Sequence, residues 1–223
     1  MKKNIIRFSL VLGVISVVTG FGLAAVYQVT RARIEQKERV AFEAALKSMF
    51  PDATGFAPLS AGKEGAAGEV WDQKGVAKAV RDSATLGYVC VGEQQGYSSR
   101  IRVLVACDTA YAVKSVQVLF AAETPGLGER IKEVKSELTV WEAAAQELGL
   151  SEKKGGGAVM PWFQAQFTGK TIDKLVVVKG DTKDNIQAIT AATVTSRAVT
   201  AAVKAALEEI MRETGAQAPE EAR

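Results

Sequence analysis

Hydrophobic residues near the N-terminus form one long run that contains no charge. The run reads "FSLVLGVISVVTGFGLAAVYQV", from Phe8 to Val29. At the rise of an α-helix its about 22 residues reach about 33 Å, enough to cross the hydrocarbon core of a membrane. Tyr27 stands near the far edge of the run, where interfacial aromatic residues are common. The pattern predicts a single transmembrane anchor over residues 1–30.

A cleaved signal peptide is the alternative interpretation of this run, because "GLAAV" places small residues near a possible cleavage point. The run exceeds the 7–15 apolar residues that such peptides usually contain, which favours a retained anchor. Basic residues flank both ends, from Lys2, Lys3 and Arg7 to Arg31 and Arg33. The charge pattern therefore does not settle the orientation of the anchor.

Residues 31–70 follow as a predicted helical stalk and loop. Between Arg31 and Phe50 the chain is rich in Glu, Lys, Arg, Ala and Leu, with spaced apolar positions such as Ile34 and Leu46. This is typical of a solvated helix that continues from the anchor, and Pro51 ends it. The next stretch, "ATGFAPLSAGKEGAAGE", contains Gly, Pro and Ser and predicts a loop.

Short runs with β-type alternation dominate the following part of the chain. Four runs rich in Val, Ile and Tyr, separated by turn residues, predict strands: "GVAKAVRD", "LGYVCVGE", "SSRIRVLVACD" and "AYAVKSVQVLFAAE". The last two flank "CDTAYA", a predicted hairpin connection. Helical spacing follows in "TPGLGERIKEVKSELTVWEAAAQEL", then a Gly-rich loop "SEKKGGG", and another apolar strand in "DKLVVVKGD".

The last periodic segment predicts a helix from about Thr195 to Arg212, because its apolar positions recur at helical spacing. Antiparallel strands combined with packed helices give an α+β domain over residues 71–213. The polar residues 214–223 are expected to form a disordered tail.

Composition excludes several classes of function. The chain has 223 residues, 48% of them hydrophobic, and its net charge of +3 lacks the basic stripe that nucleic-acid binding needs. It contains no histidine, which excludes Ser-His-Asp and Cys-His nucleophilic sites and removes the commonest zinc ligand. Cys90 and Cys107 lie in apolar runs and are interpreted as buried small hydrophobic residues, with a disulfide between strands as the alternative.

The stretch "ETPGLGER", Glu123 to Arg130, is the first candidate site. Pro125 and Gly126 suit the two central positions of a type II turn, and Gly128 adds a second flexible position. Such a turn brings backbone N–H groups close to a ligand, although a plain strand-to-helix turn would need the same residues. Neither GxGxxG nor GxxxxGK[ST] occurs, so a dinucleotide fold and a P-loop are unsupported.

The second candidate is "QAITAATVTSRAVTAAV", which leads into the last helix. Thr195 or Ser196 is a natural N-cap for that helix. Thr190 and Thr193 would then lie just before a helix N-terminus, where N–H groups and the helix dipole favour an anion. Helix capping and a phosphate-ester site both account for the threonines.

Three motifs in this order behind one apolar span are similar to those of the G subunit of Rnf electron-transport complexes. They are "ETPGLGERIK", "PWFQAQFTGK" and "AITAATVTSRAVTAAV", and the similarity covers roughly residues 97–207 and the anchor. The C subunit of sodium-translocating NADH:quinone oxidoreductase is a related family. The resemblance implies a flavoprotein subunit that carries electrons between ferredoxin and NAD in an ion-translocating complex and is not catalytic alone.

The resemblance also implies a cofactor, site residues and partners. FMN would be attached by a phosphoester bond to Thr193, the last residue of a motif that reads Thr190-Ala191-Ala192-Thr193 here. The flavin would be lined by Glu123, Thr124, Pro125, Gly126, Leu127 and Gly128, with Thr190 and Thr195 near its phosphate. No metal site and no catalytic residue are expected. The partners would be the other Rnf subunits and a flavin transferase, with the domain on the periplasmic side of a bacterial inner membrane.

Two positions depart from the family pattern. Ala191 replaces a glycine, and Gln187 stands where the transferase motif usually has aspartate. The methyl group of Ala191 fits without strain where that residue has negative φ. These departures motivate an alternative function, a flavin-free assembly subunit of the same complex. A membrane-anchored FMN reductase that acts alone is a further alternative.

Overall fold

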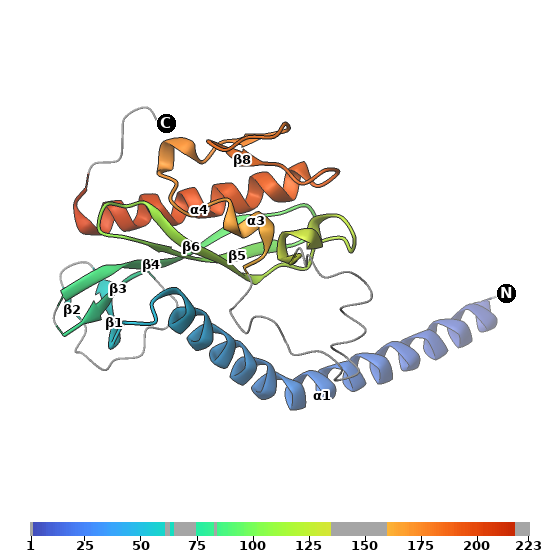
Figure 1. Ribbon diagram of the computed structural model, residues 1–223. Coiled ribbons are helices and arrows are strands. Elements are labelled where there is room, and N and C mark those ends of the chain that lie inside the picture. The colour runs from blue at the N-terminus through green and yellow to red at the C-terminus, as the bar shows by residue number, and fades with distance from the viewer. Residues whose placement is uncertain (1, 61–62, 65–74, 83, 135–159, 217–223) are drawn as a thin grey trace, which may run out of the picture. The chain divides into compact units, whose positions relative to one another are not determined.

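The computed structural model describes residues 2–60, 63–64, 75–82, 84–134 and 160–216. These residues group into two compact units, Met1–Ala44 and Ala45–Arg223. The sequence predictions for "SEKKGGG", for the helical spacing after Val134 and for the end of the tail lie outside the described residues. The elements of the two units are shown in Figure 1.

The N-terminal residues form one helix, α1 (Lys2–Met49). An 18-residue window in it has a mean hydropathy of 2.2, so the helix is long and apolar enough to cross a membrane. The large apolar side chains from Phe8 to Val29 are exposed in the isolated chain, as expected of a surface that meets lipid. The helix continues without a break to the residue before Phe50 and Pro51, as predicted for the stretch after the anchor.

The second unit is built on a six-stranded antiparallel sheet in the order β2-β1-β3-β4-β5-β6. Its strands are β1 (Gly55–Ser60), β2 (Lys63–Glu64), β3 (Val76–Arg81), β4 (Ala84–Gln95), β5 (Arg100–Cys107) and β6 (Val113–Phe120). Strands β3 to β6 match the four strands predicted from alternation, and β5 pairs with β6 as the predicted hairpin. The α+β fold class is thus confirmed.

Strand β1 lies where the sequence predicted only a loop, and that prediction was wrong. Its pairing with β3 aligns Phe56 with Ala79 and Leu59 with Val76. The ring of Phe56 meets the buried ring of Phe50 edge to face at 6.4 Å. Pairing and packing with residues distant in the sequence therefore impose the strand, despite the Gly and Pro that predict a loop.

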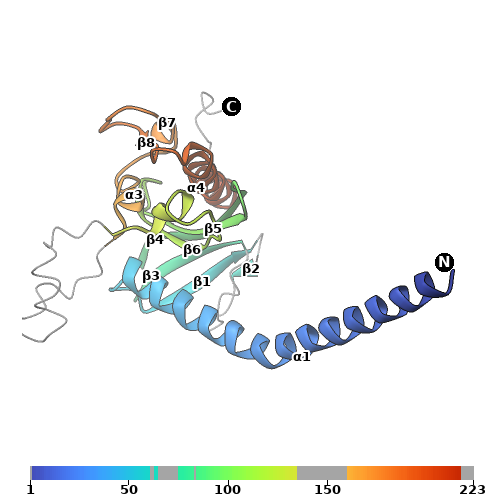
Figure 2. The same cartoon turned by 90° about the vertical axis from the view of Figure 1, so that its right-hand side faces the viewer.

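Helix α4 (Thr193–Thr214) covers one face of the central strands β4 and β5. Figures 1 and 2 show the helix, in red, lying across the sheet. Its buried side chains include Val199, Val203 and Leu207, which lie in one hydrophobic core with Val103 and Val105 of β5. The predicted amphipathic helix is confirmed, and its apolar stripe faces the sheet.

Short elements complete the unit between β6 and α4. They are η1 (Gly128–Lys132), α3 (Trp162–Ala165), η2 (Ile172–Lys174), and the parallel pair β7 (Val177–Val178) and β8 (Ile186–Gln187). Buried Gln164 of α3 accepts a hydrogen bond from Val118 N–H of β6 and donates one to the carbonyl of Ile131 in η1, at 3.4 and 2.9 Å. This amide fixes η1 against the edge of the sheet.

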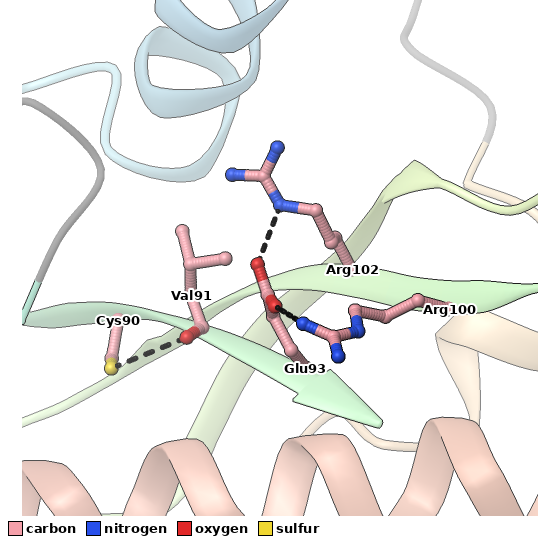
Figure 3. Close-up of polar contacts among 5 residues, drawn as sticks. All are labelled: Cys90, Val91, Glu93, Arg100 and Arg102. Atoms are coloured by element: carbon pink, nitrogen blue, oxygen red, sulfur yellow. Dashed lines mark hydrogen bonds and ion pairs between the residues drawn. The ribbon is translucent and has the colours of Figure 1, made fainter. Parts of the chain in front are cut away.

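Both cysteines are buried and free, so the interpretation as small hydrophobic residues is confirmed and the disulfide alternative is not. They lie on neighbouring strands, with Cys107 opposite Tyr88 and Cys90 opposite Val105. The Cys90 thiol lies 3.8 Å from the carbonyl oxygen of Val91 (Figure 3). Burial raises the pKa of each thiol to about 12, which keeps both protonated and unreactive at neutral pH.

The contact between α4 and the sheet depends on Gly92 of β4. A Cβ atom at this position would lie 2.0 Å from the carbonyl oxygen of Ala202 and 3.2 Å from the Cβ of Ala206. The Gly92→Ala substitution should therefore push the helix from the sheet and lower the free energy of unfolding by about 3 kcal/mol. Urea unfolding of the full chain in detergent measures this loss.

Gly180 provides the matched control, because a Cβ atom there would meet nothing within 4 Å. The Gly180→Ala substitution should change the free energy of unfolding by no more than about 0.5 kcal/mol. Equal effects of the two substitutions would contradict the close approach at Gly92.

Candidate functional site

The N-terminus of α4 carries the threonine-rich stretch. The helix begins at Thr193, its N-cap residue is Ala192, and no side chain caps it. Ser196 lies inside the first turn, where its hydroxyl accepts a hydrogen bond from Ile189 N–H and donates one to the carbonyl of Ala192, both at 3.0 Å. The prediction that Thr195 or Ser196 is the N-cap was therefore wrong, because both hydroxyls bond elsewhere.

The residues before this helix form a tight turn. Ala192 N–H donates to the carbonyl of Ile189 at 3.0 Å, which places Thr190 and Ala191 at the two central positions. Ala191 has φ +63°, in the left-handed region, so the condition under which its methyl group fits without strain, a negative φ, is not met. A turn with positive φ at its third residue favours glycine, and an alanine there is strained by about 1 kcal/mol.

The stretch "TAAT" is accessible. Thr190 and Ala191 are exposed, Ala192 is buried, and Thr193 is half-buried at the first residue of the helix. No large side chain belongs to the turn, so the hydroxyl of Thr193 and the first N–H groups of α4 face no bulky neighbour within this stretch.

The stretch "ETPGLG" forms the turn predicted for it. Leu127 N–H donates to the carbonyl of Thr124 at 3.2 Å, and Gly126 has φ +73° at the third position, as a type II turn requires. Pro125, Gly126 and Leu127 are exposed. Gly128 is buried, and a Cβ atom on it would lie 2.7 Å from the hydroxyl oxygen of Thr195. The structure thus brings this turn against the first turn of α4.

Glu123 joins the two stretches through a buried carboxylate. Only 7% of the residue is exposed. Its oxygens accept hydrogen bonds from the N–H groups of Tyr97, Ser98 and Ser99 at 3.1–3.3 Å, and from the hydroxyl of Thr195 at 2.7 Å. The carboxylate therefore points into the protein and holds three segments together.

The pKa of Glu123 reflects two opposing effects. Burial is the largest and raises the pKa, because it disfavours the charged carboxylate. The hydrogen bonds from Thr195, Ser99, Ser98 and Tyr97 favour the charged form and together outweigh burial, so the pKa is lowered. The residue is thus a stable buried anion at neutral pH.

Sequence reasoning missed the turn Tyr97–Ser99 between β4 and β5, which supplies three of the donors. In the sequence, only Gly96 hints at this contact, because a glycine leaves room for a close neighbour. A Cβ atom at Gly96 would lie 2.5 Å from a carboxylate oxygen of Glu123. The hydroxyls of Ser98 and Thr124 also lie 3.3 Å apart, which links this turn to the "TPGLG" turn.

Gln187, just before "AITAAT", is held by two side chains. Its N–H donates to the side-chain oxygen of Gln166 at 2.8 Å, and its own amide donates to the carboxylate of Asp181 at 2.6 Å. A carboxylate, that of Asp181, therefore lies directly beside the position where the resemblance implies an aspartate.

The Glu123→Gln substitution should lower the free energy of unfolding by about 3 kcal/mol at pH 7, because an amide cannot accept all the bonds of the buried carboxylate. A lowered folded-state pKa stabilises the fold above the ordinary glutamate value of 4.5, and this stabilisation is lost as the pH falls through the folded-state pKa. The difference in the free energy of unfolding between the Glu123→Gln chain and the unaltered chain should therefore become smaller below about pH 4.5. Thermal unfolding between pH 7 and pH 3 measures it.

Glu93 offers the control, a carboxylate at the protein surface. It lies 3.4 Å from Arg100 and 2.9 Å from Arg102 (Figure 3). Glu93→Gln should cost less than about 1 kcal/mol, because exposed ion pairs contribute little. A Glu123→Gln chain as stable as Glu93→Gln at every pH would contradict the structural role of the buried carboxylate.

The Ala191→Gly substitution should raise the free energy of unfolding by about 1 kcal/mol, since glycine adopts positive φ without steric cost. The control is Ala201→Gly on the exposed face of α4, which should lower it by about 1 kcal/mol through lost helix propensity. Opposite signs in urea unfolding are expected. A destabilising effect at Ala191 would contradict the turn geometry.

Comparison with known proteins identifies the family. Residues 96–208 match the FMN-binding domain family, and residues 1–49 match the RnfG N-terminal region. The G subunit of the proton-translocating ferredoxin:NAD(+) oxidoreductase complex of Clostridium ljungdahlii is 32% identical over 89% of this chain and 87% of its own length. The G subunit of the Na(+)-translocating ferredoxin:NAD(+) oxidoreductase complex of Acetobacterium woodii is 29% identical over 92% and 91%.

A solved structure is also similar to the chain. It is the crystal structure of NqrC from Shewanella oneidensis, which matches with a TM-score of 0.45 and 19% identity over 71% of this chain and 80% of that one. The sequence matches span both helix α1 and the domain that contains Glu123. This chain belongs to the family of Rnf complex G subunits and carries an FMN-binding domain.

Proposed function

We propose that this chain carries electrons within an Rnf-type ion-translocating ferredoxin:NAD oxidoreductase complex, through an FMN attached by a phosphoester bond to Thr193. The observation that carries the proposal is the position of Thr193. Its hydroxyl lies at the first residue of a 22-residue helix that no side chain caps, in a family whose domain binds FMN.

The phosphate end of FMN fits the residues around Thr193. The first N–H groups of a helix and its dipole favour a phosphate, and Ala192 offers no side chain that competes for them. Thr190 and Ala191 are exposed, so a flavin transferase could reach the turn. Thr195 would contribute its backbone N–H, because its hydroxyl already donates to Glu123.

The ring end of FMN fits the "TPGLG" turn. Pro125, Gly126 and Leu127 are exposed there, and the buried contact of Gly128 with Thr195 holds the turn beside the first turn of α4. When bound, FMN supplies the redox chemistry. The chain's residues would attach it through Thr193 and orient it by the "TPGLG" turn, and Glu123 would place a negative charge nearby.

The partners follow from the named relatives, which are subunits of ferredoxin:NAD(+) oxidoreductase complexes. We infer that this chain assembles with the other subunits of such a complex and needs a flavin transferase for maturation. Helix α1 would anchor it as a single span, with the domain on the extracytoplasmic side of the membrane.

A flavin-free assembly subunit is the second candidate. Ala191 is strained where the similar family has glycine, and Gln187 presents an amide rather than a carboxylate. Asp181, bonded to that amide, keeps a negative charge beside this position, which favours the flavin-carrying subunit.

The test is the intact mass of the chain in the complex purified from its native host. The unaltered chain should carry one FMN, and Thr193→Ala should lose it completely because no other hydroxyl occupies the first residue of α4. Flavin fluorescence of the denatured chain on a gel gives an independent readout.

Two controls sharpen this result. Thr190→Ala should keep the flavin, and Thr193→Ser should keep it because a hydroxyl remains. An unaltered chain with no added mass would favour the flavin-free subunit, and an added mass that survives Thr193→Ala would place the attachment elsewhere.

A further inference from the structure

Glu123 carries a buried negative charge that no cation neutralises within the part of the chain that the structure describes. All of its donors there are neutral: the three N–H groups of the turn Tyr97–Ser99 and the hydroxyls of Ser99 and Thr195. The cations of η1 bond elsewhere, since Arg130 pairs with Glu133 at 3.0 Å and Lys132 donates to the carbonyl of Ala121. Neutral donors hold the carboxylate in its charged form, and no ion pair of the described residues cancels its negative charge.

The position of this charge ties it to the proposed flavin site. Glu123 directly precedes the "TPGLG" turn, and its carboxylate touches Thr195, two residues after Thr193 in the first turn of α4. With 7% of the residue exposed, water and salt screen the charge poorly. Two charges interact more strongly through the buried contact between Glu123 and the first turn of α4 than they would through water.

We propose that Glu123 is a positioning residue that also lowers the reduction potential of the flavin bound at Thr193. The proposal rests on the proposed attachment of FMN. An electron that arrives from a partner subunit adds negative charge to the site, and the fixed carboxylate makes this addition less favourable. Glu123 itself exchanges neither electron nor proton, so the electron passes on to the partner that accepts it.

Two substitutions separate the charge from the hydrogen bonds. Glu123→Gln removes the charge with little change of shape. Thr195→Val removes the shortest hydrogen bond, at 2.7 Å, with little change of shape, and keeps the charge. A structural role alone predicts lower thermal stability for both chains and no distinct change in potential.

The first experiment is a spectroelectrochemical titration of each full flavinylated chain in detergent. The second is thermal unfolding of the same variants made in a Thr193→Ala background, which carries no flavin. Glu123→Gln should shift the midpoint potential to a more positive value. Thr195→Val should lower the melting temperature without this positive shift. Glu208→Gln is the control, since Glu208 is exposed on α4 about 22 Å along the helix from Thr193, and it should change neither quantity.

The outcomes distinguish this inference from the proposed function. A flavinylated Glu123→Gln chain with an unshifted potential, or one shifted equally by Thr195→Val, would overturn the role of the charge and leave the attachment intact. An unaltered chain without flavin would instead overturn the proposed function. If Glu123→Gln folds poorly, the substitution is made together with Ala191→Gly, which should stabilise the fold. The midpoint potential of the double variant is then compared with that of Ala191→Gly alone.

Discussion

One buried carboxylate holds together the segments on which the candidate site depends. Glu123 accepts hydrogen bonds from the turn between β4 and β5 and from the first turn of α4, and it stands at the start of the "TPGLG" turn. A buried charge is stable only when polar groups surround it, so these donors must stay in place as long as the residue is ionised. The fold thus uses the electrostatic cost of burial to fix three segments that lie far apart in the sequence.

Glycines make this arrangement possible by allowing close approach. Gly96 and Gly128 leave room for the carboxylate and for Thr195, and Gly92 lets the backbone of α4 rest on β4. A Cβ atom at any of these three positions would lie within 3 Å of a backbone or side-chain atom. The helix N-terminus is therefore set by the sheet below it and by the buried anion beside it, and side-chain capping plays no part.

The sequence predicted those elements whose signals are local. Alternation identified β3 to β6, helical spacing identified α4, and Pro125-Gly126 identified the type II turn. Strand β1 was missed because its pairing and packing partners lie elsewhere in the chain. The donors to Glu123 were missed for the same reason, since Tyr97 lies 26 residues away from it. A threonine or serine near a helix start also suggests an N-cap, and only the structure shows its hydroxyl bonded elsewhere.

The turn before Thr193 shows which property of its third residue, Ala191, the local fold depends on. The resemblance implies glycine there, and this chain has Ala191 with φ +63°. A methyl group at an exposed position meets no steric barrier beyond the backbone strain of about 1 kcal/mol. The turn therefore requires a positive φ at position 191 and does not require that the residue lack a side chain. This backbone conformation directs Thr193 to the start of α4. An alanine meets that requirement at a small cost in stability, whereas a β-branched residue would be strained far more.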